Sequence, residues 1–438
     1  MIMEQYERPS IKLVSSILPS KGGQTCYKPP LTDIEGISTN TLVKQYGSPL
    51  FVVSEKQIRE NIREAKLVFN RFYPKIQFAW SYKTNYFDEV CKVFHQEGSI
   101  AEVVSSFELE KALRNGMPGN KIIFNGPNKK KEDLINAIHK NVIIHIDNFD
   151  ELYLLESLTE HLNVPVNTAI RLNMKTGTNN EWERFGFNYE NNEAFSAAKR
   201  IIKSKYLKLI GIHCHIGTFI LSTTPYKVAA QKMVQFALRL RKELNTTLDY
   251  IDMGGGFSSQ NSLKTAYNNM SVPPSLSNYA ESITKELFNS EFCEEERPTL
   301  VLETGRALID NAVTLLASVL SSKMNRTGHR LLTIDAGVNL LNTSFWYNHE
   351  IVPTKPYSDF YEDTTVYGPL CMNIDVIRES VLLPAVTKDD VIAILNVGAY
   401  NMTQWMQFIN LHPAVVMIKA DGSINLLKGK DSTDSVNY

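Results

Sequence analysis

Short apolar runs alternate with amphipathic helical stretches eight times between residues 76 and 302, and this alternation limits the fold more than any other feature. The runs are Ile76–Trp80, Ile100–Val104, Ile122–Phe124, Val142–Ile146, Thr168–Leu172, Leu209–Cys214, Tyr250–Met253 and Leu300–Leu302. Strands separated by helices are parallel, because a parallel pair needs a crossover connection. Eight such units predict a (β/α)8 TIM-type barrel of the α/β class. A doubly wound open sheet is the alternative that strand count alone leaves open.

The helices expected between these runs have recognisable boundaries. They cover Phe87–Glu97, Ser106–Asn115, Lys131–His139, Phe149–Thr159, Glu193–Lys203, Tyr226–Leu244 and Tyr279–Phe288. Ser54 followed by Gln57 has the spacing of a capping box and predicts another helix start. Gly98 and Gly116 stand where C-terminal caps belong.

The pattern changes after Arg306. Strand-like runs then recur with few helices between them, at Thr314–Leu320, Leu331–Ile334, Val381–Val386, Val391–Leu395 and Val415–Ile418. This pattern predicts a C-terminal β-sandwich or β-barrel domain. We therefore expect two domains: a barrel over residues 51–306, and a β domain formed by residues 1–50 with 307–438.

Charge and cysteine usage exclude several classes of protein. Lys and Arg total 46 against 47 Asp and Glu, giving a net charge of -1, which argues against a nucleic-acid partner. The five cysteines are scattered and form no CxxC pair, which fits a reducing compartment and no structural zinc. The N-terminus lacks a signal-peptide pattern, and no apolar stretch approaches the ~20 residues of a spanning helix. We expect a cytoplasmic protein without a membrane partner.

Polar or glycine-rich clusters follow seven of the predicted strands. They begin at Tyr82, Ser105, Asn125, Arg171, His213, Gly254 and Glu303. Loops are polar in any protein, so one cluster would carry no weight. Because active sites of this barrel lie at the C-terminal ends of the strands, seven clusters favour a site lined by the whole rim.

Two of these clusters suggest particular chemistry. Lys83 follows an apolar run, where a lysine is costly unless its charge is paired or its pKa is lowered. A desolvated lysine forms a Schiff base with an aldehyde; an ordinary surface lysine is the alternative. Gly254, Gly255 and Gly256 let backbone N–H groups approach an anion, although a glycine triplet is often only a turn.

Three further residue types have competing interpretations. We expect His213 and His215 to face opposite sides of their strand, one behind the barrel and one inside it, which disfavours a metal site. Glu303 is either an acid at the end of the eighth strand or the ion-pair partner of Arg306. Cys371, as a lone cysteine, is most simply a small core residue.

Taken together, these motifs resemble the barrel-type pyridoxal-phosphate decarboxylases, the family of diaminopimelate, ornithine and arginine decarboxylases. The similarity runs from Leu50 to Pro413 and is greatest to diaminopimelate decarboxylase. The landmarks occur in family order: Ser81–Asn85, Ser105–Leu109, Arg184–Gly186, His213–Gly217, Asp252–Phe257, Glu303–Arg306, Asp335–Gly337, Gly368–Cys371 with Asp375, and Gly398–Tyr400.

The resemblance implies a role for each matching position. Lys83 would hold pyridoxal 5'-phosphate as a Schiff base, His215 would stack on its ring, and Glu303 would pair with the pyridine nitrogen. The phosphate would be bound by Thr218, Gly254, Gly255, Gly256, Gly305 and Tyr400, and Arg306 would reach phosphate or substrate.

The resemblance also implies a homodimer whose second subunit supplies Cys371 and Tyr400 from its β domain. Glu303 would keep the pyridine nitrogen protonated so that the ring drains charge from Cα, and Cys371 would donate the proton to Cα. Alanine racemases share the barrel and the lysine but place an arginine beside that nitrogen, so Glu303 favours decarboxylation. A racemase and a regulatory protein with degenerate catalysis remain alternatives.

Three departures from the family concern the substrate. The loop from Asn173 to Arg184 is short and lacks the usual spacing before Arg184–Gly186. Met372 stands where diaminopimelate decarboxylases carry the acid that contacts the distal amino group, and Asn342 begins the segment that replaces their distal carboxylate arginine. A buried unmatched charge would cost recognition. We therefore expect an amino-acid decarboxylase with an altered distal pocket, acting on another amino acid or an amino-acid conjugate, as in siderophore or other specialised metabolism. A true meso-diaminopimelate decarboxylase of lysine biosynthesis is the alternative.

Overall fold

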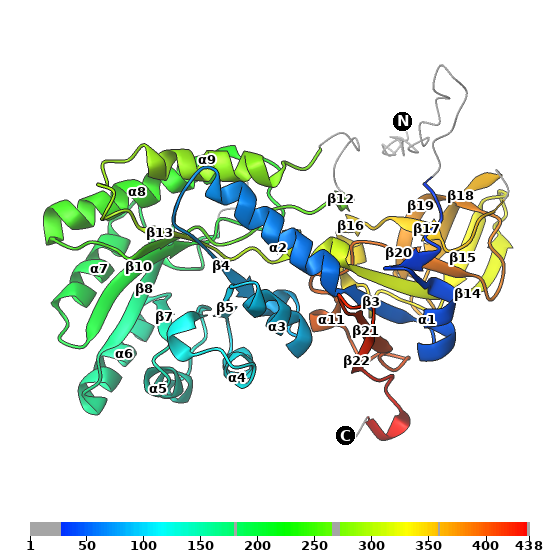
Figure 1. Ribbon diagram of the computed structural model, residues 1–438, viewed down its shortest axis with the longest axis horizontal. Coiled ribbons are helices and arrows are strands. Elements are labelled where there is room, and N and C mark those ends of the chain that lie inside the picture. The colour runs from blue at the N-terminus through cyan, green and yellow to red at the C-terminus, as the bar shows by residue number, and fades with distance from the viewer. Residues whose placement is uncertain (1–27, 179–181, 265–271, 358–359, 436–438) are drawn as a thin grey trace, which may run out of the picture.

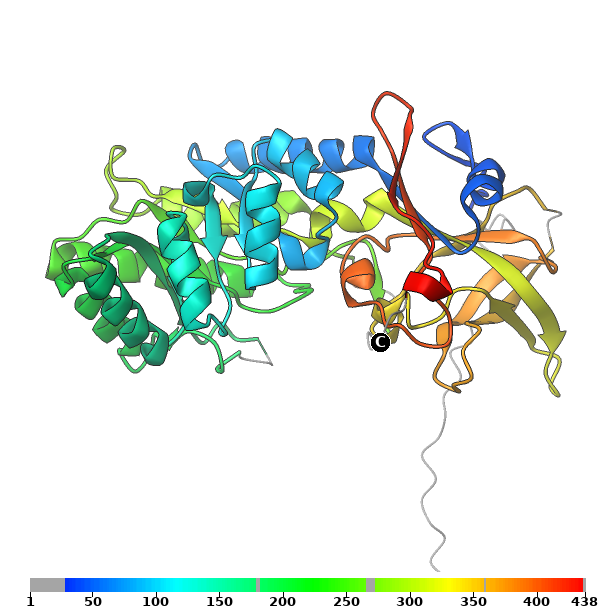
Figure 2. The ribbon, with the colours of Figure 1, turned by 90° about the horizontal axis from the view of Figure 1, so that it is seen from below.

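The computed structural model describes residues 28–178, 182–264, 272–357 and 360–435. A helix-rich part, containing α2 to α9, and a strand-rich part lie side by side (Figure 1). Figure 2 shows the same two parts after a quarter turn. Residues 1–27 of the predicted β domain lie outside the described residues. No helix in the described ranges has the length and apolarity needed to cross a membrane.

Eight parallel strands form a closed barrel in the described part of the chain. They are β4 (Ile76–Ser81), β5 (Ile100–Val103), β6 (Ile122–Phe124), β7 (Ile143–Ile146), β8 (Val166–Asn173), β10 (Leu207–Cys214), β11 (Tyr250–Asp252) and β13 (Thr299–Leu302). The ring closes because β13 pairs with β4 and β8 pairs with β10. The predicted barrel is confirmed, and the open-sheet alternative is excluded.

Helices cover the outside of the barrel with their apolar faces turned inward. They are α2 (Glu55–Asn70), α3 (Asp88–Gln96), α4 (Ser106–Arg114), α5 (Lys131–His139), α6 (Phe149–Leu162), α7 (Glu193–Lys203), α8 (Thr224–Leu244) and α9 (Leu276–Phe288). In α7 the buried residues are Ala194, Ala197, Ala198 and Ile201, the i, i+3, i+4, i+7 pattern of one helix face. Ser54 caps α2 by accepting from the Gln57 N–H, as its spacing predicts.

The second domain is built around the long strand β14 (Val313–Met324). The sheet also contains β3 (Leu50–Ser54), β15 (Arg330–Ile334), β17 (Ile351–Pro353), β18 (Tyr361–Tyr367), β19 (Val376–Pro384), β20 (Val391–Ile394), β21 (Ala414–Ile418) and β22 (Ile424–Lys428). Three short elements precede β3 in the described chain: β1 (Asp33–Ile34), β2 (Ile37–Ser38) and α1 (Thr39–Tyr46). A domain of strands after Arg306 is therefore present.

Strand β3 corrects the predicted domain boundary at residue 51. It pairs with β14 and with β21, so it belongs to the second sheet and not to the barrel. All five of its residues are buried, which fits a strand covered on both faces. The chain enters the barrel only after this strand, through α2.

Four short elements join the two domains at the barrel rim. Strand β12 (Ser262–Leu263), in the loop after β11, pairs with β16 (Tyr347–Asn348) of the second domain. Helix α10 (Arg306–Ile309) leads from β13 toward β14, and α11 (Asn401–Gln404) follows Tyr400. Side chains of both domains therefore meet above the carboxyl ends of the barrel strands.

Candidate active site

A cavity of about 640 Å³ lies where the barrel rim meets the second domain. Its walls come from the strand ends and from the segments around Tyr347 and Tyr400. The residues lining it are Lys83, Glu102, Val104, Asn125, Gly126, Pro127, Arg171, Trp182, Arg184, Phe185, His213, His215, Thr218, Phe219, Leu263, Glu303, Arg306, Thr343, Trp346, Tyr347, Tyr400 and Gln404. A site at this end of the strands is what the polar clusters predict.

We call the buried end of the cavity the floor, formed by Lys83, Glu102, Asn125 and Glu303. The more exposed end, formed by Trp182, Arg184, Trp346 and Gln404, is the mouth.

Lys83 is held on the floor by a buried carboxylate. Its Nζ lies 2.7 Å from Oε2 of Glu102, which is fully buried at the end of β5. Although burial opposes the charge, Glu102 and Glu303 raise the pKa of Lys83 above its ordinary value. The charge of Lys83 in turn lowers the pKa of Glu102 against the effect of burial. Of the two states the sequence allowed for a lysine here, the structure shows the paired one.

Glu303 is a buried acid in a crowded group of polar side chains. Asn125 Nδ2 donates to Oε1 of Glu303 and also to Oε1 of Glu102, 3.1 Å away. Burial raises the pKa of Glu303 well above its ordinary value, and the negative charges of Asp252 and Glu102 raise it further. A carboxyl group in this position can keep a proton at neutral pH and share it with a basic atom in the cavity.

The prediction that His213 and His215 face opposite sides of the barrel wall is wrong. Both line the cavity, because residues two apart along a strand share a face; the intervening Cys214 is buried on the other side. Gly255 N–H donates to Nδ1 of His215 at 3.1 Å, so the ring proton of a neutral His215 lies on Nε2. Burial lowers the pKa of His215 well below its ordinary value, which favours that neutral ring.

His213 belongs to a buried group that the sequence argument against metal did not foresee. One potential ligand atom from each of His145, His213, Asp252 and Glu303 lies within 4.8 Å of the others. Nδ1 of His213 is 3.4 Å from Oδ2 of Asp252 and 3.6 Å from Oε1 of Glu303. The expectation of no metal stays a prediction, and its original reason does not hold.

The glycine-rich loop after β11 and the turn after β13 expose backbone N–H groups. Gly254 and Gly255 donate to Asp252 and His215, whereas the N–H groups of Gly256 and Gly305 have no acceptor among the described residues. A Cβ on Gly256 would stand 2.2 Å from the Gly217 oxygen, and one on Gly305 would stand 2.2 Å from Oγ1 of Thr84. Glycine is therefore required at both positions, and both offer a donor to an anion.

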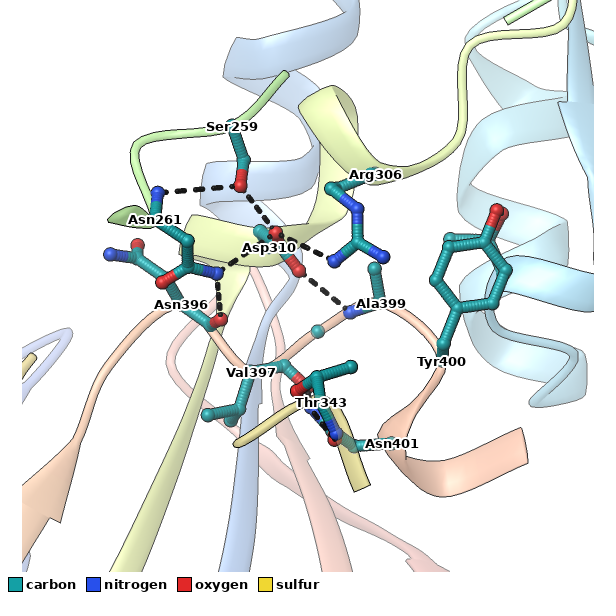
Figure 3. A network of polar contacts seen from close by, with 12 residues as sticks. Ser259, Asn261, Arg306, Asp310, Thr343, Asn396, Val397, Ala399, Tyr400 and Asn401 are labelled. Atoms are coloured by element: carbon teal, nitrogen blue, oxygen red, sulfur yellow. Dashed lines mark hydrogen bonds and ion pairs between the residues drawn. The ribbon is translucent and has the colours of Figure 1, made fainter. Parts of the chain in front are cut away.

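Arg306 is anchored by a buried aspartate that joins the two domains (Figure 3). Asp310 Oδ2 lies 3.4 Å from Nη1 of Arg306 and accepts from Ser259 Oγ at 2.6 Å. The other oxygen of Asp310 accepts from the Ala399 N–H at 2.9 Å. The Arg306 guanidinium also lies 4.9 Å from the centre of the Tyr400 ring. One carboxylate thus fixes both the arginine and the loop before Tyr400.

Tyr400 lines the cavity of its own chain, which corrects the expectation that a second subunit supplies it. Its N–H donates to the Thr84 oxygen at 2.9 Å, and Thr84 follows directly after Lys83. This contact within the chain places the Tyr400 ring in the cavity without help from another copy.

Seven residues of the predicted site are not part of the lining of this cavity. Gly254, Gly255, Gly256 and Gly305 are four of them, and the other three belong to the second domain. Cys371 is exposed on the second domain, and Met372 packs partly buried against the core. Asn342 donates to Oε1 of the cavity residue Gln404 at 3.1 Å. Asn342 therefore acts on the mouth only through Gln404.

Glu102, Trp182, Trp346 and Gln404 line the cavity but were not predicted from the sequence. Glu102 was detectable in principle, because it is a lone acid inside the apolar run Ile100–Val104. The other three lie on segments distant in sequence, and no local pattern marks them.

Comparison with known proteins agrees with this geometry. Residues 55–310, more than half of the chain, match the model of the pyridoxal-dependent decarboxylase family, pyridoxal binding domain. The chain belongs to the pyridoxal-dependent decarboxylases. This family accounts for a lysine, a buried acid and a glycine-lined anion site at one barrel end. The protein is therefore a pyridoxal-phosphate-dependent amino-acid decarboxylase.

Diaminopimelate decarboxylases are among its most similar relatives. That of Bacillus methanolicus is 29% identical over 412 residues, covering 91% of this chain and 94% of the relative. The crystal structure of the Methanocaldococcus jannaschii enzyme superposes with a TM-score of 0.84 at 28% identity, covering 92% of this chain and 94% of that one. The same enzyme in co-complex with L-lysine gives a TM-score of 0.83.

Proposed function

We propose that this decarboxylase acts on an α-amino acid other than meso-diaminopimelate, with Lys83 and Glu303 as its principal catalytic residues. The observation that carries the assignment of residues is the floor of the cavity. There, Lys83 donates to Glu102, and Asn125 donates both to Glu102 and to Glu303, the buried acid with a raised pKa.

The residues of the floor and rim fit pyridoxal 5'-phosphate. Lys83 offers an amine to the cofactor's aldehyde, and Glu303 offers a proton-sharing partner to its ring nitrogen. The unpaired N–H groups of Gly256 and Gly305, with Thr218, Tyr400 and Arg306, suit its phosphate. When bound, the cofactor supplies an electron sink for the bonding electrons that CO₂ leaves behind on Cα.

The chain's own residues would then control protons and orientation. Glu303, whose pKa is raised by burial, would share its proton with the nitrogen of the cofactor ring, and this would keep the ring electron-poor. His215, a neutral ring whose Nδ1 accepts from the Gly255 N–H, would offer its face to the cofactor ring for stacking. Glu102 keeps Lys83 in place and can accept or return the proton of its Nζ.

The proton delivered to Cα comes in this proposal from Cys371 of a second copy of the chain. Cys371 is exposed and does not line the cavity of its own chain, so a homodimer is needed to bring it to a site. A thiol is a competent general acid when positioned against the carbon that needs a proton.

The names of the relatives favour meso-diaminopimelate as substrate, and the altered distal residues argue against it. The segment Met372–Asn373–Ile374 after Cys371 contains no acid. The next residue, Asp375, is buried and accepts from the N–H groups of Val338 and Leu370, so it is not available to a substrate. A distal ammonium would therefore lack its partner, and another amino acid or an amino-acid conjugate fits better.

Release of CO₂ from a panel of amino acids tests this function. The purified protein with cofactor should release CO₂ from at least one amino acid while racemising none. Borohydride should attach the cofactor irreversibly to Lys83, and the absorbance of the Schiff base should disappear. Rapid conversion of meso-diaminopimelate to lysine, in preference to all others, would contradict the proposed substrate. Racemisation without CO₂ would contradict the reaction.

A further inference from the structure

Two more side chains, His213 and Asp252, meet behind Glu303 on adjacent strands of the barrel. His213 on β10 is the register partner of Asp252 on β11, and β11 pairs with β13, directly before Glu303. Gly254 holds both acids: its N–H donates to Oδ1 of Asp252 at 2.8 Å, and its carbonyl oxygen accepts from the Glu303 N–H at 2.8 Å. Asp252 is fully buried and is not part of the cavity lining. Any effect of Asp252 on a ligand in the cavity therefore passes through its neighbours.

The two acids are too close together, and too deeply buried, for both to be ionised. Nδ1 of His213 lies 3.4 Å from Oδ2 of Asp252 and 3.6 Å from Oε1 of Glu303. Burial raises the pKa of both acids, and a hydrogen bond between their carboxyl groups lowers that of Asp252 and raises that of Glu303. Such a bond needs a proton on one partner, because an ionised carboxylate can only accept. Two carboxyl groups in one buried site hold a single proton between them.

The cations near this pair already have acids of their own. Lys83 pairs with Glu102 at 2.7 Å, and Arg171 pairs with Asp147 at 3.8 Å. The titratable groups that act on the pair come from several strands of the barrel. They include Lys83, Glu102, His145, Arg171, His213, Cys214 and Tyr250.

The histidines, cysteine and tyrosine of this set are neutral at neutral pH. Burial lowers the pKa of His145 and of His213 well below the ordinary value. Burial also raises the pKa of Cys214 and of Tyr250 above the ordinary values. Nε2 of His145 lies 2.6 Å from the Tyr250 hydroxyl, so this side of the pair offers a neutral hydrogen bond and no charge. A retained proton is thus what limits the negative charge of the acid pair.

We propose that Asp252 and Glu303 hold one proton between them, and that Asp252 is the positioning residue that keeps this proton on Glu303, beside the cavity. The N–H of Gly254 favours the ionised form of Asp252, so Asp252 carries the charge and Glu303 the proton. This inference rests on the proposed function, in which Glu303 shares its proton with the cofactor ring, and adds what keeps Glu303 protonated. The negative charge of Asp252 holds that proton to a higher pH.

Infrared spectroscopy of the full-length protein before cofactor is added measures this proton without turnover. A protonated carboxyl group absorbs apart from an ionised one, and the contribution of Glu303 is the part of the band that Glu303→Gln lacks. We expect this part to be present at neutral pH. In Asp252→Asn, which keeps an acceptor for Gly254, its midpoint should fall by at least about one pH unit, because the neighbouring negative charge is gone.

In the holoenzyme, the same variant should show a pH signature that a purely structural role would not give. The kcat of Asp252→Asn should fall progressively below that of the wild type as the pH rises, reaching a loss of about 10-fold near pH 8. KM should change little, because Asp252 does not line the cavity. The pH midpoint of the bound cofactor's absorbance should move in the same direction as the infrared midpoint.

Asp335→Asn is the matched control. Asp335 also accepts a backbone N–H, from Ser318 at 2.8 Å, and burial also raises its pKa, but it lies in the second domain. Its substitution should leave the midpoint of Glu303 unchanged.

The outcomes separate this inference from the function beneath it. A Glu303 midpoint that Asp252→Asn does not move overturns the inference, and so does a band at neutral pH that disappears in Asp252→Asn but persists in Glu303→Gln. Stoichiometric metal in the purified protein, whose removal by a chelator shifts the midpoint, also overturns it, because a cation would then neutralise the pair. Should Asp252→Asn fail to fold, absence of a Glu303 band from the wild type at neutral pH still contradicts the inference. Absence of CO₂ release from every amino acid, with the infrared result as expected, contradicts the proposed function alone.

Discussion

The floor and the mouth of one cavity are built on opposite principles. On the floor, Glu303 is 5% exposed, and each charged group has a fixed neighbour within the barrel. At the mouth, Trp346 is 52% exposed, and Arg184 is unpaired with the described residues. Buried polar groups must be satisfied or they are costly, so a floor of this kind tolerates little change. An exposed mouth can change its side chains without endangering the fold, which is how one reaction can serve different substrates.

The largest expected effect comes from the floor's amine. Lys83→Ala should lower kcat by at least about 10³-fold, because the covalent attachment to the cofactor is lost. Steady-state CO₂ release measures the rate, and borohydride fixation measures the attachment. Lys111→Ala serves as the control, since Lys111 pairs with Asp88 at 2.7 Å outside the cavity. Near-normal activity in Lys83→Ala would show that the floor does not carry the chemistry.

The second-largest effect is expected from Glu303, the buried acid of the floor. Glu303→Gln keeps the shape and a polar contact to Asn125 but cannot share a proton, so kcat should fall about 10²- to 10³-fold with KM little changed. Single-turnover CO₂ release isolates the chemical step. A change confined to KM would mean that Glu303 binds the substrate and does not act on the ring.

A substitution of Asp310 tests whether its carboxylate holds Arg306 in position for the cofactor. Asp310→Asn keeps one acceptor oxygen, for either Ser259 or Ala399, and removes the charge that anchors Arg306, so the Kd for pyridoxal phosphate should rise about 10-fold. Titration of the apoprotein with cofactor, followed by absorbance, gives this Kd. The thermal unfolding temperature of the apoprotein should also fall, because loss of a buried charge pair destabilises the fold. An unchanged Kd would show that Arg306 holds its place without Asp310.

The smallest effect belongs to the exposed mouth. Trp346→Ala should change the free energy of unfolding by no more than about 0.5 kcal/mol, as for other surface substitutions, and should alter KM with little effect on kcat. Chemical denaturation and steady-state kinetics check the two parts. A large loss of stability would mean that the mouth is as rigid as the floor, and the contrast between them would fail.

The barrel could be predicted from the sequence because parallel strands buried on both faces consist of short runs of apolar residues. All eight predicted runs became barrel strands. Strand β3 was placed wrongly, because its four apolar residues look the same in either sheet and only pairing with β14 and β21 decides. Strands such as β18, with the polar sequence Tyr361–Tyr367, carry no apolar run and were missed.

The residues of the site also divide into those that the sequence predicted and those that it did not. Lys83, Glu303 and the glycines were found because each follows a strand and so reaches the rim. The placement of His213 and His215 failed through a wrong assignment of strand faces. Trp346 and Gln404 could not be found, because loops more than 250 residues from Lys83 in sequence bring them to the mouth.

A competition between two amino acids tests the central claim, that the catalytic floor of this decarboxylase serves an altered distal pocket. Racemic 2-aminopimelate and meso-diaminopimelate differ only by the distal amino group, and the protein would receive both at equal concentration. The account predicts that 2-aminopimelate is consumed first, with 6-aminohexanoate as the product seen by mass spectrometry. Preferential formation of lysine from meso-diaminopimelate would contradict it.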